Sequence, residues 1–135
     1  MDTHYTAVAT ANGRDGKAVS SDGRLSLPLA IPREMGGSGD GTNPEQLFAA
    51  GYAACFASAL GAVARATRQD VRDVSVTAEV GIGGSVESGF GLSVVLRIEL
   101  PDDLQNGRDL VERAHQVCPY SNATRGNIPV ELVIE

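Results

Sequence analysis

Apolar and polar residues alternate along several segments of the chain, which is the pattern of strands that bury one face. Turn residues rich in glycine separate two pairs of these segments, so hairpins join them and the sheets should be largely antiparallel. The predicted strands cover residues 5–11, 18–20, 24–29, 74–82, 90–98 and 128–134.

A long run of residues, 46–64, carries no charge and interrupts this alternation. A helix-start signal precedes it, because Asn43 can cap a helix, Pro44 suits the first helical position and Gln46 can reach back to the cap. We therefore predict a central helix over residues 44–67.

The same run is long enough to raise the question of a membrane span. Its residues are mostly alanine, the chain has no tryptophan, and no basic girdle flanks the run. A helix that is apolar on all sides in a soluble chain is enclosed by protein. We expect a core helix and no membrane contact.

A second helix is predicted over residues 107–118, where apolar residues recur at helical spacing. Pro119 disfavours helical geometry at Cys118 and should end the helix there. The resulting order is β-β(-β)-α-β-β-α-β, so we predict an α+β fold in one domain spanning residues 1–135, with the sheet curling around the central helix.

Charge and cysteine content narrow the possible functions. The formal net charge is −6 with a pI near 4.8, which argues against nucleic acids and anionic membranes as partners. Two cysteines do not make the disulfide framework of a secreted domain, and the first residues show no secretory signal. We expect a reducing, cytoplasmic location.

Cys55 lies in the middle of the apolar run, and two interpretations of it stay open. Unpaired cysteine is among the most buried residue types, so Cys55 can be an inert core thiol whose pKa the apolar helix raises. A functional Cys55 must be a thiolate, and the helix dipole does not reach so far beyond the first turn. Lowering its pKa from about 8.5 to about 6.5 needs roughly 2.7 kcal/mol, which one desolvated guanidinium can supply.

Arg14 is the favoured source of that guanidinium, because it lies on the turn after the first predicted strand. Arg33, on the loop before the helix, is the weaker rival, and Asp22 is a further group that could support Arg14. Glu45 is the natural acidic partner, although a first-turn carboxylate also simply complements the helix dipole.

Helix geometry separates Glu45 from Cys55. Ten residues correspond to about 15 Å along a straight helix and to about 80° in azimuth. An arginine paired with Glu45 would be stretched to reach the thiol of the same chain. We therefore hypothesise that the site is shared across a homodimer.

Cys118 admits three interpretations. It can form a disulfide with an oxidised Cys55 if the two Cα atoms come within about 7 Å. It can also be an apolar core residue at the helix end. His115, Cys118 and Cys55 together could be three ligands of a metal ion, but no fourth group converges in the sequence.

Three stretches resemble the organic hydroperoxide resistance (Ohr) proteins of the Ohr/OsmC family. The first two are GTNPEQLFAAGYAACF at residues 41–56 and VCPYSNATRGN at residues 117–127. The third, GRDGKAVSSDG at residues 13–23, resembles the arginine loop of the family. The similarity spans essentially the whole chain, and the sequence after the Cys-Pro pair favours the Ohr branch over the OsmC branch.

The resemblance implies an OsmC-like fold, with curved, largely antiparallel sheets around a long buried helix, in an intertwined homodimer. It implies a thiol-dependent peroxidase that protects against oxidative stress by reducing organic hydroperoxides, including those of fatty acids. Cys55 would be the peroxidatic cysteine and Cys118 the resolving cysteine. Arg14 would stabilise the thiolate and the peroxide, and Glu45 would orient Arg14.

The resemblance also implies that no cofactor is bound and that dihydrolipoyl groups on a lipoylated protein partner act as the external dithiol reductant. Two alternatives stay open from the residues. One is an OsmC-type peroxidase with a different peroxide preference, and the other is a non-catalytic dimeric module with inert core thiols.

Overall fold

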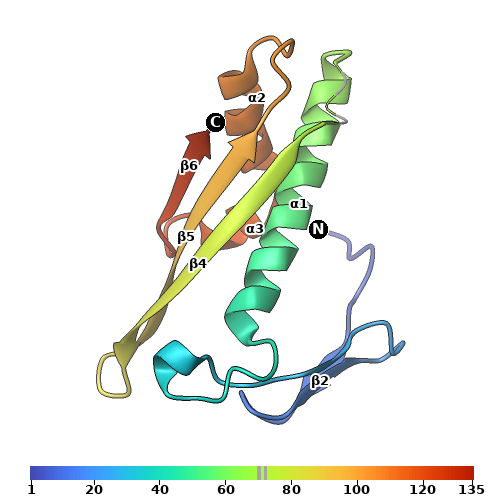
Figure 1. The fold of residues 1–135 in the computed structure, drawn as a ribbon. Helices are drawn as coiled ribbons and strands as arrows, with labels where there is room; N and C mark the ends of the chain where they lie inside the picture. Colours follow the sequence, from blue (N-terminus) through green and yellow to red (C-terminus); the bar gives the residue numbers. More distant parts are fainter. Residues whose placement is uncertain (70, 72) are drawn as a thin grey trace. The chain divides into compact units, whose positions relative to one another are not determined.

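The computed structural model of the protein describes residues 1–69, 71 and 73–135 (Figure 1). The chain forms two compact units, Met1–Leu47 and Phe48–Glu135, and the boundary between them falls inside helix α1. In chain order the elements are β1 (Ala9–Ala11), β2 (Lys17–Ser20), β3 (Ser26–Pro28), the 3-10 helix η1 (Arg33–Met35), α1 (Pro44–Ala66), β4 (Ser75–Ser85), β5 (Gly89–Glu99), α2 (Gly107–Val117), α3 (Pro119–Thr124) and β6 (Val130–Ile134).

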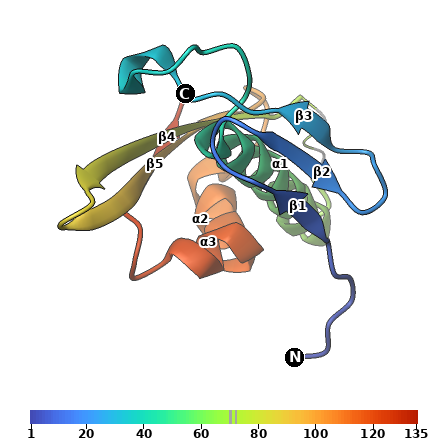
Figure 2. The same ribbon diagram turned by 90° about the horizontal axis from the view of Figure 1, so that it is seen from below.

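The first unit contains a small antiparallel sheet in the order β1-β2-β3 (Figure 2). Its outer strands are shorter than the alternation predicted over residues 5–11 and 24–29. β2 is only four residues long, so it offers few partners to either neighbour. A turn follows β2, in which Asp22 accepts hydrogen bonds from the Ser20 hydroxyl at 2.7 Å and the Arg24 amide at 3.0 Å.

The second unit contains a mixed sheet in the order β4-β5-β6. β4 and β5 form the predicted antiparallel hairpin, with Val76 opposite Ile98 and Val80 opposite Val94. β6 pairs with β5 in parallel, because the chain returns to the sheet through α2 and α3 rather than through a hairpin. The prediction of largely antiparallel sheets is therefore correct for every strand pair except this one.

The core of the second unit lies between this sheet and its helices, which cover one face of it (Figures 1 and 2). Val94, Leu96 and Ile98 alternate along β5 and are almost fully buried. From α1, α2 and the corner after α2 the fully or nearly buried core residues are Tyr52, Phe56, Leu60, Ala64, Leu110, Val111, Ala114 and Cys118.

Helix α1 begins and ends where the sequence predicts, within one residue. Its length and hydropathy alone would allow it to cross a membrane, and 39% of its most apolar window is buried inside the protein. One face of the helix packs in the core described above, as expected for a core helix. Ala54, Ser58 and Ala62, which follow one another at four-residue steps, are exposed in the single chain.

Helix α2 ends at the predicted place, where Cys118 adopts an extended backbone (φ −60°, ψ 123°) before Pro119. The short helix α3 was not predicted. Pro119 occupies its first position, where a missing N–H costs nothing, so the residue that stops one helix also starts the next.

Candidate functional site

The two cysteines lie side by side in the second unit. Cys55 is in the middle of α1, and Cys118 is at the corner between α2 and α3. Their Sγ atoms are 3.5 Å apart, and both are free thiols. Cys118 is fully buried, whereas Cys55 is partly exposed. Because a disulfide is about 2.05 Å long, only a small movement of the side chains separates the pair from a covalent bond.

The surroundings of Cys55 raise the pKa of its thiol. Burial is the main cause, and the neighbouring thiol of Cys118 adds to it. A hydrogen bond from the backbone N–H of Tyr120 acts in the opposite direction, because it favours the charged sulfur. The expectation that the apolar surroundings raise the pKa of this thiol is confirmed.

Tyr120 also packs against α1 one turn before Cys55. A Cβ at Gly51 would come within 2.7 Å of the Tyr120 hydroxyl oxygen, so a larger residue there would push the ring away from this position. The centroid of this ring lies 5.9 Å from that of Phe48 and 5.6 Å from that of Tyr52. The start of α3 is therefore fixed on the helix beside the sulfur.

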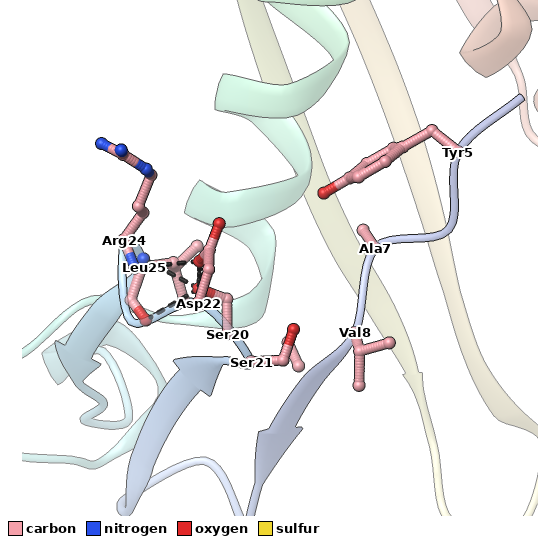
Figure 3. Close-up of a pocket in the computed structure, with 9 residues that line it drawn as sticks. Tyr5, Ala7, Val8, Ser20, Ser21, Asp22, Arg24 and Leu25 are labelled. Carbon is pink, nitrogen blue, oxygen red and sulfur yellow. Dashed lines mark hydrogen bonds between the residues drawn. The ribbon is translucent and has the colours of Figure 1, made fainter.

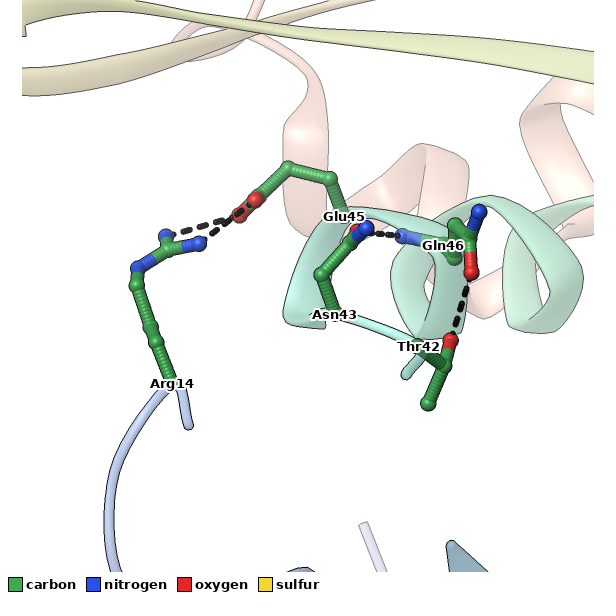
Figure 4. Close-up of polar contacts among 5 residues, drawn as sticks. All are labelled: Arg14, Thr42, Asn43, Glu45 and Gln46. Carbon is green, nitrogen blue, oxygen red and sulfur yellow. Dashed lines mark hydrogen bonds and ion pairs between the residues drawn. The ribbon is translucent and has the colours of Figure 1, made fainter. Parts of the chain in front are cut away.

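Arg14 and Glu45 form a two-point ion pair in the first unit (Figure 4). The two terminal guanidinium nitrogens of Arg14 donate to the two carboxylate oxygens of Glu45, at 2.7 and 2.9 Å. The hydrogen bonds from Arg14 lower the pKa of Glu45, and those to Glu45 raise the pKa of Arg14. The Glu45 side chain is 13% exposed and that of Arg14 is 34% exposed, so the guanidinium is half-open to other partners.

The helix start holds Glu45 in place. Asn43 caps α1 by accepting a hydrogen bond from the Gln46 amide at 2.8 Å, as the sequence predicts. The Gln46 side chain does not reach back to Asn43, because its oxygen accepts a hydrogen bond from the Thr42 hydroxyl at 2.6 Å (Figure 4). Glu45 is thus the second helical residue of a doubly fixed first turn.

Arg33 and Asp22, the other charged candidates, form hydrogen bonds within their own loops. The Nε of Arg33 donates to the backbone oxygen of Ser38 at 3.1 Å and stabilises the glycine-rich loop. Asp22 is engaged in the turn after β2, where the hydrogen bond from Ser20 is the main reason that its pKa is lowered. Among the candidates named from the sequence, the structure pairs Arg14 only with Glu45.

The metal alternative gains no support. His115 is bonded through Nδ1 to the Ser121 hydroxyl oxygen at 2.8 Å. Within residues 1–69, 71 and 73–135, no three His, Cys, Asp or Glu side chains come together as metal ligands.

Sequence reasoning missed a buried set of hydroxyl groups beside the cysteines. The Tyr52 hydroxyl lies 2.8 Å from the Ser121 hydroxyl oxygen and 3.2 Å from that of Thr124. All three residues are almost completely buried. Hydroxyl residues on apolar helix faces were the available signal, but nothing in the sequence shows which of them meet.

A shallow hollow of about 340 Å³ lies elsewhere, in the first unit (Figure 3). Tyr5 and Val8 form one wall of it, and the turn that holds Ser20, Asp22 and Arg24 forms the other. The carboxylate of this turn is already satisfied by the turn itself, so the hollow presents no reactive group.

Comparison with known proteins identifies the family of the chain. The family model described as "OsmC-like protein" matches residues 37–133. An organic hydroperoxide resistance protein of Xanthomonas axonopodis pv. citri is 58% identical, over 96% of this chain and 94% of its own length. The chain therefore belongs to the organic hydroperoxide resistance (Ohr) proteins of the Ohr/OsmC family.

Solved structures show the same fold. That of an organic hydroperoxide resistance protein from Legionella pneumophila superposes with a TM-score of 0.93 at 50% identity, covering 99% of each chain. The structure of OhrB from Bacillus subtilis gives a TM-score of 0.87 at 40% identity, covering 98% of this chain and all of that one. The predicted α+β class, the OsmC-like fold and the resemblance to Ohr proteins are confirmed.

Proposed function

We propose that the protein is a thiol-dependent peroxidase that reduces organic hydroperoxides to alcohols and so protects its cell against oxidative stress. The observation that carries this proposal is the pair of free thiols 3.5 Å apart, one partly exposed and one fully buried, in a member of the Ohr family. The partly exposed sulfur can meet a peroxide, and the buried sulfur can only meet its neighbour.

The chemistry follows from this division of roles. The Cys55 thiolate attacks the distal oxygen of the hydroperoxide, the O–O bond breaks, and the departing alkoxide takes up a proton to become the alcohol. Sulfur loses two electrons and becomes a sulfenic acid. The Cys118 thiol then attacks that sulfur, an S–S bond forms, and the hydroxyl leaves as water with the Cys118 proton.

Arg14 supplies the cation in this proposal. It stabilises the Cys55 thiolate and the negative charge that grows on the departing oxygen. A guanidinium has five N–H donors, and Glu45 uses two of them, so three stay available for sulfur and peroxide. Glu45 holds the planar guanidinium in one orientation through its two hydrogen bonds.

We place the site at the interface of a homodimer, with Arg14 and Glu45 of one subunit facing Cys55 of the other. The distance along α1 from Glu45 to Cys55 supports this, as does the exposed stripe of Ala54, Ser58 and Ala62 on an apolar helix.

Complementation tests the shared site. As homodimers at neutral pH, Arg14→Ala is expected to keep about a hundredth of the parental activity and Cys55→Ser none that can be measured. Dissociated, mixed and reassembled, they form heterodimers in which one of two sites has both residues, so about a quarter of the parental activity should return. No recovery, with heterodimers demonstrated by native mass spectrometry, would show that each chain builds its own site.

The disulfide must be reduced again from outside the protein. We propose an external dithiol, the dihydrolipoyl group of a lipoylated protein, and no bound cofactor, in the reducing setting of the cytoplasm. Turnover of an alkyl hydroperoxide with a dihydrolipoyl reductant, compared with turnover of hydrogen peroxide, separates this activity from that of an OsmC-type peroxidase with another preference.

One observation favours a second function, a non-catalytic dimeric module. The surroundings of Cys55 raise its pKa, as they would for an inert core thiol. Counting free thiols before and after one equivalent of an alkyl hydroperoxide decides between the two. The peroxidase loses two thiols per chain, whereas the inert module keeps both.

A further inference from the structure

The buried hydroxyl set connects the elements that carry the two sulfurs. Ser121 is its centre, because its Oγ lies 2.8 Å from the Tyr52 hydroxyl oxygen and 2.8 Å from Nδ1 of His115. Tyr52 and Ser121 are fully buried, and within the described part of the chain no buried side-chain nitrogen or oxygen lacks a hydrogen-bond partner. We call Tyr52, Ser121 and His115 the Ser121 network.

Each member of the network stands three residues from a cysteine. Tyr52 precedes Cys55 on α1, so the two side chains are neighbours on one face of that helix. His115 precedes Cys118 on α2, and Ser121 follows Cys118 on α3. The network therefore ties together all three segments that set the distance between the two sulfurs.

The corner that contains Cys118 is also fixed by its backbone and by Arg125. The Cys118 amide donates to the carbonyl of Ala114 at 2.8 Å, and the Cys118 carbonyl accepts from the Asn122 amide at 2.9 Å. On the outside, Arg125 donates to the backbone oxygen of His115 and to the side chain of Asn122. These contacts join α2 to α3 but not to α1. Apart from the contacts that Tyr120 and Cys118 make with the Cys55 sulfur itself, Tyr52 provides the hydrogen bonds that join this corner to α1.

The arrangement of protons supports a continuous chain of hydrogen bonds. Burial, and then the charge of Arg125, lowers the pKa of His115. A neutral imidazole can accept the Ser121 proton at Nδ1, which leaves the Ser121 oxygen free to accept the Tyr52 proton. The Thr124 hydroxyl donates to the backbone oxygen of Ser121 at 3.1 Å, and its oxygen lies 3.2 Å from the Tyr52 hydroxyl, farther than the 2.8 Å between Tyr52 and Ser121.

We propose that Tyr52, Ser121 and His115 are positioning residues that hold the Cys118 thiol against Cys55 while the disulfide forms. The positioning role rests on the proposed peroxidase function in one respect: that function supplies the hydroperoxide that oxidises Cys55. In the step concerned, the Cys118 sulfur attacks the sulfenic sulfur of Cys55, the S–O bond breaks and water leaves. A misplacement of about 1 Å in such a reaction costs on the order of a hundredfold in rate.

The test measures the disulfide-forming step against the oxidation step. Stopped-flow quenching with mass spectrometry gives the rate of Cys55 oxidation and the rate of the following Cys55–Cys118 bond formation. In Tyr52→Phe and in Ser121→Ala the ratio of the second rate to the first should fall by about tenfold or more. Tyr5→Phe and Ser26→Ala remove the same groups at exposed positions and should leave the ratio unchanged.

A second measurement does not depend on peroxide. Equilibration with glutathione buffers gives the stability of the Cys55–Cys118 disulfide, and losing the network should favour the dithiol by about tenfold, or about 30 mV. His115→Asn offers a polar atom near the Nδ1 position and should keep the parental stability of the disulfide, whereas His115→Leu should lower it.

The outcomes separate the two proposals. If alkyl hydroperoxide leaves the parent's thiols intact, the proposed peroxidase fails, and the glutathione equilibrium still decides the role of the network. If Tyr52→Phe and Ser121→Ala fold with parental circular dichroism and keep the parental ratio and equilibrium within about twofold, the positioning proposal is overturned.

Discussion

The two units of the molecule hold their reactive groups by opposite means. In the second unit, Cys55 and Cys118 lie against an apolar core between a sheet and its helices. In the first unit, Arg14 and Glu45 are held by a turn, a helix start and two charge-assisted hydrogen bonds, among mostly exposed residues. Low polarity positions the sulfurs but raises the pKa of Cys55, whereas the guanidinium of Arg14 is partly exposed and has donors that Glu45 does not use.

In the proposed peroxidase, this contrast means that neither unit is sufficient by itself. The core raises the pKa of Cys55, so the sulfur is well placed and chemically weak. The guanidinium of Arg14 has N–H donors that Glu45 does not use. Its own unit contains no thiol, since both cysteines belong to the second unit. The proposed peroxidase needs the sulfur and the guanidinium to meet.

The largest effect is expected at the sulfurs. Cys55→Ser should lose all measurable hydroperoxide turnover, a fall of at least about a thousandfold, because a hydroxyl cannot replace the thiolate. Cys118→Ser should complete one oxidation and then inactivate rapidly at high peroxide, because the sulfenic acid has no partner. Stopped-flow oxidation and intact-protein mass spectrometry measure both. If Cys118→Ser abolished the first oxidation, the assigned roles would be wrong.

The next largest effect concerns stability, because a core substitution should cost far more unfolding free energy in the second unit than a surface substitution in the first. Leu60→Ala removes a fully buried side chain of α1 and should cost about 2–5 kcal/mol of unfolding free energy, because it leaves a cavity. Leu27 is 36% exposed on β3, so Leu27→Ala should change stability by no more than about 0.5 kcal/mol. Urea unfolding followed by circular dichroism gives both values. Equal losses at the two positions would contradict the assignment of the core.

Arg14→Ala tests whether the guanidinium in the first unit activates the Cys55 thiol. Loss of the guanidinium should reduce the rate of Cys55 oxidation by about a hundredfold at neutral pH, the equivalent of two pKa units of the thiol. The Cys55 pKa should rise in this variant, so its rate should continue to increase with pH where the parent has reached its plateau. Arg14→Lys keeps the charge but loses the two-point pairing, and we expect only partial recovery.

A pH–rate profile for the parent and both variants provides the measurement. An unchanged profile in Arg14→Ala would show that the cation comes from elsewhere, and Arg33→Ala is the matched control on the neighbouring loop.

Much of the fold could be predicted because its signals are local. Asn43 and Pro44 mark the start of α1, and Pro119 marks the end of α2, through their own backbone chemistry. The hairpin of β4 and β5 follows from alternation on both sides of a turn. The parallel pairing of β6 and the shortness of β1 depend on which partner strand is available, which no local pattern encodes.

The candidate site also has a part with a local sequence signal and a part that depends on tertiary packing. Glu45 could be predicted as the partner of Arg14 because it is the acidic residue at a clear helix start, and the pair is present. The Tyr52–Ser121 hydrogen bond joins residues 69 positions apart, on an apolar helix and beyond a proline. Only the packing of α3 against α1 brings these hydroxyls together, so the sequence could not show it.

The smallest effect concerns the pH dependence of the Arg14–Glu45 pair. The folded protein lowers the pKa of Glu45, chiefly through the hydrogen bonds from Arg14, so the carboxylate binds its proton less readily than in the unfolded chain. The pair's contribution to stability is therefore fully present above the unfolded pKa of about 4.3 and is lost as the pH falls through the folded value. Because the guanidinium is partly open to water, we expect less than about 1 kcal/mol.

Glu45→Gln removes the titrating group and keeps the size of the side chain. The unfolding free energies of parent and variant should differ most above about pH 5 and converge as the pH falls below about 4, where the parent carboxylate is protonated as well. Glu79→Gln, in the exposed pair with Arg97, is the matched control and should show a smaller difference, because water screens both of its partners. If the parent were instead less stable than Glu45→Gln above about pH 5, burial rather than Arg14 would govern this carboxylate.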